Sequence, residues 1–201
     1  MAAVVLAGGG GARFGGPVAK LLVPFRGRPL ASWAIASAVA SGLDAVVVVS
    51  GAVDLAPLLD ELGLDVVVAE NPRWPEGQAT SLRAGIDACA GLGMEAAVIG
   101  LADQPLVPAA AWRAVGRSPV TQGAPILTAV FGGRRRPPVR LHRSVWEMVS
   151  NRGDEGAREL MRRRPDLVGE VLCDGDPADV DTLEDLQRYD PGSGAADVDG
   201  R

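Results

Sequence analysis

Aromatic residues, cysteine and histidine are all scarce in this sequence. Aromatics make up 4% of the 201 residues, and there are two cysteines, Cys89 and Cys173, and one histidine, His142. These three residues do not have the spacing of a metal site, and two isolated thiols do not form a disulfide framework. We therefore expect a reduced, cytosolic protein. With few aromatic rings, its core must be packed mainly by Ala and Val, as is common in parallel sheets flanked by helices.

The sequence also lacks an excess of basic residues and a long apolar run. Its 20 Lys and Arg residues stand against 25 Asp and Glu residues, which gives a net charge of −5. This balance argues against general binding to nucleic acid or to an anionic membrane. No apolar segment approaches the ~20 residues needed to cross a bilayer, and the apolar start lacks the basic n-region of a secretory signal. We expect a cytoplasmic protein with no nucleic-acid or membrane partner.

Short β-branched runs alternate with segments of helical period, which is the pattern of βαβ units. Strands are predicted at 2–7, 45–50, 65–70, 96–103, 124–131 and 167–173, and helices at 29–41, 54–63, 78–90, 156–163 and 182–189. The predicted fold class is α/β, a three-layer α/β/α sandwich around a mostly parallel, Rossmann-like sheet. Ligands of such sheets bind at the carboxyl ends of the strands. We expect one domain over residues 1–189 and a disordered tail over residues 190–201.

Glycine is dense directly after the first predicted strand, in the segment LAGGGGARFGGPVAKLL at residues 6–22. Six glycines fall between Gly8 and Gly16, and Arg13 and Lys20 add positive charge. Glycines free backbone N–H groups to surround an anion. The dinucleotide fingerprint G-x-G-x-x-G fails in every register, and Lys20 is not part of a Gly-Lys-Ser/Thr loop. The segment therefore predicts a polyphosphate site of another type, the alternative being a flexible loop with a solvated Lys20.

Several segments resemble motifs of the MobA-like nucleotidyltransferases. The glycine segment is similar to the signature loop of that family, through Leu6-Ala7-Gly8-Gly9, Arg13-Phe14-Gly15-Gly16 and Lys20-Leu21-Leu22. The resemblance continues through Asn71-Pro72, Trp74, EGQATSLRAG at 76–85, LADQPLV at 101–107, GDEGAR at 153–158 and DVDTLEDL at 179–186. These blocks span nearly the whole chain in the family's order. The most similar branch is the molybdenum-cofactor cytidylyltransferases.

The resemblance implies that the glycine loop wraps the triphosphate of a nucleotide. Arg13 and Lys20 would then neutralise its phosphates, and a Mg²⁺ ion would be held by Asp103, at the end of a predicted strand, and by Asp181. The residues expected to act in catalysis are Arg13, Lys20 and Asp103. Those expected to bind the nucleotide are Leu6, Ala7, Gly8, Gly9, Gly10, Arg13, Lys20, Ser81 and Asp103. The family's acceptor site corresponds to Gly153 and Asp154.

Some of these residues also have a plain structural explanation. Asp103 suits a turn before Gln-Pro, and Asp154 and Asp181 suit helix N-caps. Arg83 either reaches a phosphate or lies in solvent. The triplets Arg134–Arg136 and Arg162–Arg164 are expected to be solvated, the first near the mouth of the pocket. The remaining residues with a structural interpretation are Thr80 as a cap, Trp74 as packing and His142 as a structural histidine.

The resemblance implies transfer of a nucleoside monophosphate from an NTP to a phosphorylated acceptor such as molybdopterin, with release of pyrophosphate. CTP is favoured, but Gly8-Gly9 follows the form of the guanylyltransferase branch, which leaves GTP open. Arg136-Pro137-Pro138 stands where cytidylyltransferases have Gly-His-Pro, which leaves a sugar phosphate or an isoprenoid-precursor phosphate open as the acceptor. A different class of function is a non-catalytic nucleotide-binding protein that delivers cofactor to a partner such as a molybdoenzyme.

Overall fold

The computed structural model of the protein describes residues 1–11, 14–15, 18–119 and 123–191. Arg13 and residues 192–201 of the predicted tail lie outside these ranges. Asp190, which we assigned to the tail, is bound to the body of the protein, because its Oδ2 accepts a hydrogen bond from the Arg26 backbone N at 2.5 Å. No helix among the described residues is long and apolar enough to cross a membrane.

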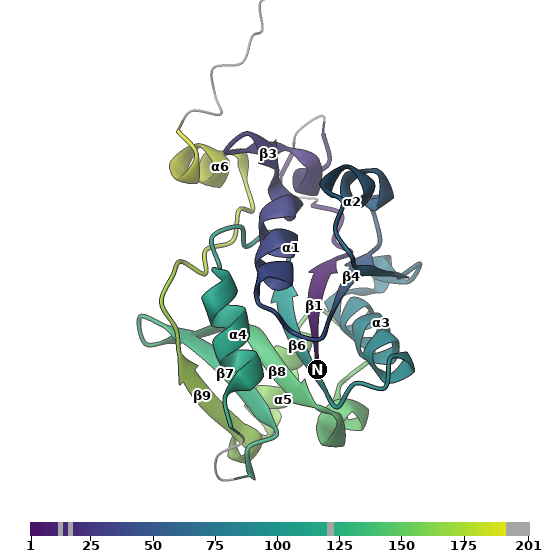
Figure 1. Ribbon diagram of the computed structural model, residues 1–201, viewed down its shortest axis with the longest axis vertical. Coiled ribbons are helices and arrows are strands. Elements are labelled where there is room, and N and C mark those ends of the chain that lie inside the picture. Colours follow the sequence, from purple (N-terminus) through teal and green to yellow (C-terminus); the bar gives the residue numbers. More distant parts are fainter. Residues whose placement is uncertain (12–13, 16–17, 120–122, 192–201) are drawn as a thin grey trace, which may run out of the picture.

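A seven-stranded sheet forms the centre of the molecule, in the order β5-β4-β1-β6-β8-β7-β9 (Figure 1). Neighbouring strands are parallel except where β8 pairs antiparallel with β6 and with β7. The strands are β1 (Ala2–Ala7), β4 (Ala45–Ser50), β5 (Val67–Glu70), β6 (Ala96–Leu101), β7 (Ile126–Phe131), β8 (Arg134–His142) and β9 (Val168–Leu172). The mostly parallel α/β sheet predicted from the sequence is confirmed.

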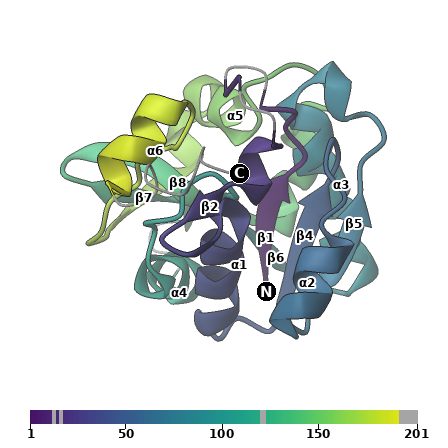
Figure 2. The same ribbon diagram turned by 90° about the horizontal axis from the view of Figure 1, so that it is seen from above.

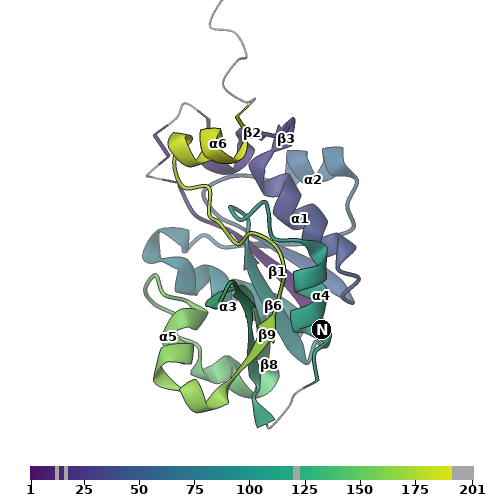
Figure 3. The same ribbon diagram turned by 90° about the vertical axis from the view of Figure 1, so that its left-hand side faces the viewer.

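Helices cover both faces of this sheet (Figure 3). One face carries α1 (Leu30–Ala40), α2 (Ala56–Leu62) and α4 (Ala109–Arg117), and the other carries α3 (Gln78–Gly91) and α5 (Ala157–Arg163). An apolar core lies on each face of the sheet, and alternate residues of β1 pack into one core or the other, because successive side chains of a strand point to opposite faces. Val5 packs in the core with α1, and Val4 packs in the core with α3.

Strand β8 is absent from the sequence-based prediction because it begins with three arginines and contains two prolines. A central strand rarely holds proline, which has no N–H for the ladder. The register between β7 and β8 shifts at this point, so that Thr128 pairs with Val139 and Ala129 pairs with Arg136. Pro137 and Pro138 fall in the skipped part of the ladder, and their missing donors break no pair. Helix α4, which buries Trp112, was also not predicted.

A small additional layer, separate from the helices on the two faces, covers the carboxyl end of the sheet. It consists of a hairpin formed by β2 (Pro24–Phe25) and β3 (Arg28–Pro29), together with α6 (Leu183–Tyr189). Phe25 of the hairpin and Leu186 of α6 share one apolar cluster. In Figure 2, which views the molecule from above, α6 and β2 lie in front of the sheet. This layer brings the C-terminal part of the chain to the loop that follows β1.

Candidate functional site

The glycine loop that follows β1 passes unusually close to α3 and to Lys20. A Cβ atom on Gly8 would lie 2.6 Å from Ser81 Oγ. Gly11 has a φ of +62°, and a Cβ on it would lie 2.8 Å from Lys20 Cβ. Both contacts are far inside van der Waals separation, and a positive φ is strained for other residues. Glycine is therefore required at these two positions for the backbone to approach the site.

A cavity of about 300 Å³ lies beside this loop, and we call it the glycine cavity. The polar end of α3 closes one side of it, where Asn71 Nδ2 donates to Ser81 Oγ at 2.9 Å. Trp74 and Gln78 line other parts of the wall. Six residues predicted to bind the nucleotide line this cavity, namely Leu6, Gly8, Gly9, Gly10, Ser81 and Asp103. Ala7 and Lys20 line a smaller space of about 60 Å³, which Leu6, Gly9 and Asp103 also line.

The Lys20 ammonium bridges two aspartates. Its Nζ donates to Asp103 Oδ2 at 2.7 Å and to Asp181 Oδ1 at 2.8 Å, and the lysine side chain is only 8% exposed. Burial acts to lower the pKa of this ammonium, but the charges and hydrogen bonds of the two carboxylates outweigh burial, so the pKa lies above its ordinary value of 10.5. Lys20 is also the only lysine in the sequence, a signal that our sequence reasoning missed.

Asp181 reaches this position because the segment before α6 is fastened at two points. The Val180 backbone N donates to the Asp103 carbonyl at 2.9 Å, which ties the segment to the end of β6. A capping box opens α6, in which Thr182 accepts from the Asp185 backbone N at 3.1 Å. The Asp185 carboxylate accepts in return from the backbone N of Asp181 at 3.1 Å and of Thr182 at 3.0 Å. The sequence predicted a cap in this region, but the cap is Thr182, which leaves Asp181 to face Lys20.

A third carboxylate, Asp179, lies close to this cluster and was not predicted as part of the site. Its Oδ1 accepts a hydrogen bond from Gln104 Nε2 at 2.9 Å, and the same Nε2 donates to the Pro177 carbonyl at 3.0 Å. Burial raises the pKa of the Asp179 carboxyl, and the nearby charge of Asp103 raises it further. Gln104 is 2% exposed, so it fixes the 177–179 segment from inside the protein.

The carboxylates of Asp103 and Asp181 fit a divalent cation. The Lys20 ammonium donates to both carboxylates, which shows that one oxygen of each converges on a single cationic position. Mg²⁺ prefers such oxygens and often takes only one or two protein ligands, the others being water and substrate phosphates. Among the described residues no group of three or more His, Cys, Asp and Glu side chains is arranged to hold a metal. A metal at this point would therefore need ligands from outside the protein.

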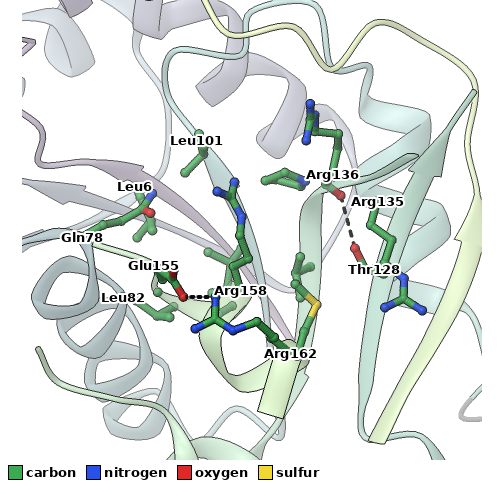
Figure 4. Close-up of a pocket in the computed structure, with 16 residues that line it drawn as sticks. Leu6, Gln78, Leu82, Leu101, Thr128, Arg135, Arg136, Glu155, Arg158 and Arg162 are labelled. Carbon is green, nitrogen blue, oxygen red and sulfur yellow. Dashed lines mark hydrogen bonds and ion pairs between the residues drawn. The ribbon is translucent and has the colours of Figure 1, made fainter. Parts of the chain in front are cut away.

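A second cavity, of about 460 Å³, adjoins the glycine cavity, and we call it the arginine cavity (Figure 4). It lies between α3, α5, β6 and β8, and four arginines line it: Arg135, Arg136, Arg158 and Arg162. Three residues line both cavities, namely Leu6, Gln78 and Leu101. The two spaces therefore meet at the carboxyl ends of β1 and β6, beside the start of α3.

The remaining predicted residues have other places. Asp154 lines the glycine cavity. The carbonyl of Gly153 accepts a hydrogen bond from the Ala79 backbone N at 2.9 Å. Along this segment of the chain, the first residue that lines the arginine cavity is Glu155. Arg83 is a structural residue whose guanidinium donates to the carbonyls of Trp146 and Val149 at 2.8 and 3.1 Å. The predicted solvation of the first arginine triplet is wrong for Arg136, which is half-buried.

The fold and this site define an α/β protein with two adjoining cavities at the carboxyl end of its sheet. The chain belongs to the MobA-like NTP transferase domain family, whose model matches residues 3–168. The resemblance seen in the sequence is therefore confirmed. Transfer from a nucleoside triphosphate is the class of activity that this family membership supports.

Two relatives cover most of the chain. The nicotine blue oxidoreductase of Paenarthrobacter nicotinovorans is 32% identical over 92% of this chain and 94% of its own. The purine catabolism protein PucB of Bacillus subtilis is 28% identical over 85% of this chain and 86% of its own.

Solved structures share the fold over nearly the full length. Rv0371c from Mycobacterium tuberculosis has a TM-score of 0.75 and 30% identity, with 94% of this chain and 96% of that chain covered. A manganese complex of Rv0371c has a TM-score of 0.72 at 27% identity, with 95% and 98% covered. The inositol-1-phosphate CTP transferase of T. maritima, at 20% identity and a TM-score of 0.71 over 93% and 94%, shows the common fold.

Proposed function

We propose that this protein transfers a nucleoside monophosphate from an NTP, with CTP favoured, to a phosphorylated small acceptor such as molybdopterin, and releases pyrophosphate. The observation that carries the proposal is the junction of the two cavities, because transfer needs two anionic substrates held side by side. Leu6, Gln78 and Leu101 line both spaces, and the cluster of Lys20 with Asp103 and Asp181 stands at the edge of the glycine cavity. The NTP is proposed to occupy the glycine cavity, and the acceptor the arginine cavity.

The chemistry asks for charge stabilisation rather than for a protein base. A phosphate monoester is already anionic at neutral pH, so no residue has to remove a proton from it. The demand is to bring two anions together and to stabilise the charge that develops on the leaving pyrophosphate. Lys20 supplies one cation for this purpose, and we propose Arg13 as a second. The glycine loop supplies backbone N–H groups without side chains in the way.

A Mg²⁺ ion is the proposed cofactor, held by Asp103 and Asp181. When bound, it would neutralise phosphate charge and orient the triphosphate. The structure of a relative in complex with manganese supports a divalent cation in this family. Because the same two carboxylates are bonded to Lys20, binding of the ion requires the ammonium to give up at least part of these contacts. The released ammonium would then be available to the phosphates.

The relative named nicotine blue oxidoreductase supports a second candidate function, reduction or oxidation of an organic substrate in the same cavities. The sequence lacks the G-x-G-x-x-G fingerprint of dinucleotide sites, which favours nucleotidyl transfer. A third candidate, the non-catalytic protein that delivers cofactor to a molybdoenzyme, would bind nucleotide without releasing pyrophosphate. Assays of pyrophosphate release and of NAD(P)H oxidation on the same preparation separate all three.

The decisive experiment uses the single lysine as a reporter. Selective ¹⁵N-lysine labelling gives one side-chain ammonium resonance, because Lys20 is the only lysine. We expect this resonance to shift on addition of CTP with Mg²⁺, and GTP, ATP and UTP serve as comparisons. Asp103→Asn should fold normally but lose transfer by about a hundredfold or more. Asp87→Asn, an exposed position on α3, is the matched control. An unmoved lysine resonance with every NTP would refute the proposed site.

A further inference from the structure

The arginine cavity has an apolar wall and a cationic rim. Leu82, Ile99 and Val139 are 1%, 5% and 4% exposed and form the buried wall between α3, β6 and β8. The side chains of Arg135 and Arg162, by contrast, are 47% and 63% exposed. A volume of about 460 Å³ lies within the range of pockets that enclose small molecules. Its occupant should therefore have one apolar part and one anionic part.

The buried wall offers few hydrogen-bond partners. Thr128 is the residue with a hydroxyl group in this wall, and it is fully buried. Its Oγ1 already donates to the carbonyl of Arg136 at 3.4 Å. An acceptor hydroxyl buried here without a partner would weaken binding by about five- to a hundredfold. A polyhydroxylated acceptor such as a sugar phosphate or an inositol phosphate would lose several such bonds to water. The wall therefore selects against polyols and favours a ring system or chain with few hydroxyls.

The arginines of the rim differ in their partners. Arg162 Nη1 lies 2.6 Å from Glu155 Oε2, and Arg135 Nε lies 2.6 Å from Glu170 Oε1. Within the described part of the chain, no carboxylate lies within 4.0 Å of the Arg158 guanidinium. Figure 4 shows the Arg158 side chain extending from α5 into the cavity in the direction of Leu101, whereas Arg135 turns away from it. Arg158 thus carries its charge to the side where the two cavities meet.

We infer that the acceptor is a phosphomonoester with a largely apolar, ring-bearing body, and that Arg158 binds its phosphate. The body packs on Ile99 and Val139, and the phosphate lies at the junction with the glycine cavity. This inference rests on the proposed function for the position of the NTP. In the transfer step an oxygen of the acceptor phosphate forms a bond to the α-phosphorus of the NTP. The bond from that phosphorus to the bridging oxygen breaks, and pyrophosphate leaves with the electron pair.

Binding of two model phosphates tests the inference without any nucleotide or metal. The probes are 1-naphthyl phosphate and inositol 1-phosphate, which carry the same phosphate on an apolar and on a polyol body. By calorimetry we expect the wild-type protein to bind 1-naphthyl phosphate at least about tenfold more tightly. Arg158→Ala should weaken this binding by about ten- to a hundredfold. Arg163→Ala is the matched control, because Arg163 is on the same helix, is paired with Glu159 at 3.7 Å and lines neither cavity.

The outcomes separate this inference from the proposed function. Equal binding of both probes, or undiminished binding by a folded Arg158→Ala variant, overturns the inference even where CTP binds and pyrophosphate is released. Arg158-dependent binding of 1-naphthyl phosphate supports it, and the absence of any NTP effect on the lysine resonance would then refute only the proposed function. Arg158 is an exposed residue, so thermal unfolding of the variant should match that of the wild-type protein.

Discussion

Lys20 and Asp103 are 83 residues apart in the sequence, yet Lys20 Nζ donates to Asp103 Oδ2 at 2.7 Å. The same nitrogen donates to Asp181, so the ammonium occupies the position where the two carboxylates converge. A divalent cation that uses these oxygens competes with an internal cation for them. The protein without substrate therefore has a built-in counter-ion, and the affinity for a bare metal should be low until phosphates draw the lysine away.

Replacement of Lys20 with methionine should raise the affinity for Mn²⁺ in the absence of nucleotide by about tenfold, because the competing ammonium is removed and two carboxylates remain. The fraction of free Mn²⁺ can be read by electron paramagnetic resonance. Transfer activity should be lost in the same variant, because the phosphates lose a cation. Arg73→Met, which makes the same charge change in an exposed pair with Glu76, is the control. An unchanged Mn²⁺ affinity in Lys20→Met would show that the two carboxylates do not hold the metal.

Asp185 is predicted to act as a positioning residue for Asp181. Its carboxylate accepts from the backbone N of Asp181 and from both the N and Oγ1 of Thr182. Asp185→Ala should cost about 1 kcal/mol of unfolding free energy, as loss of a cap does, and should raise the KM for Mg²⁺ more than it lowers kcat. Glu184→Ala, in the same turn of α6 but outside the capping box, should change neither quantity. Equal effects of the two variants would argue against positioning.

Cys89 is predicted to be unreactive in the folded protein. The thiol is fully buried, and burial raises its pKa from 9.0 to about 12. Iodoacetamide at pH 8 should therefore label the half-buried Cys173 first, and both thiols only after denaturation. Mass spectrometry of timed samples measures the order. Rapid labelling of Cys89 in the native protein would contradict the buried position.

The same shift gives a stability effect with a defined sign. The folded thiol keeps its proton between pH 9 and about 12, whereas the unfolded thiol releases it above its ordinary pKa of 9.0. The unfolded state binds fewer protons in this range, so the Cys89 contribution is complete below pH 9 and is lost as the pH rises, by up to about 1.4 kcal/mol per pH unit. Denaturant unfolding at pH 8 and pH 10 should show a smaller decline for Cys89→Ala than for the wild-type protein.

The residue pattern within a short window was enough to predict the strands and helices whose sequences have a clear apolar run or a helical period. The strand at Ala2–Ala7 and the helix at Gln78–Gly91 follow from β-branched runs and helical period, and the glycine loop after β1 predicts an anion site by itself. Asp103 could be assigned to the carboxyl edge of the sheet because it lies two residues after the end of β6. These features depend on neighbours within a few residues.

Other features depend on long-range packing and could not be read from local spacing. Asp181 contacts a lysine 161 residues away, and only the resemblance to a family assigned it to the site. Strand β8 lies between β6 and β7 in the sheet. A strand in this position is usually an apolar run, but β8 begins with three arginines, so the sequence pattern does not indicate a strand. The resulting arginine cavity, with Arg158 from another element, was therefore missed. Asp154 was assigned to the acceptor from its motif. It lines the glycine cavity, whereas the next residue, Glu155, lines the arginine cavity.

The side chains that fit at positions 8 and 81 are predicted to depend on each other, because Gly8 lies against Ser81. A Cβ on Gly8 would lie 2.6 Å from Ser81 Oγ, which Asn71 holds by a hydrogen bond. Gly8→Ala should therefore cost about 1–3 kcal/mol of unfolding free energy and weaken CTP binding. Adding Ser81→Ala removes the oxygen and leaves the nearest Ser81 atom, its Cβ, at 3.6 Å, so the double variant should recover most of that stability.

Gly9→Ala, where an added Cβ meets nothing within 4 Å, is the control for folding. A double-mutant cycle by denaturant unfolding gives the coupling energy between positions 8 and 81, and additive effects would show that the close approach of the loop to α3 is not what requires glycine.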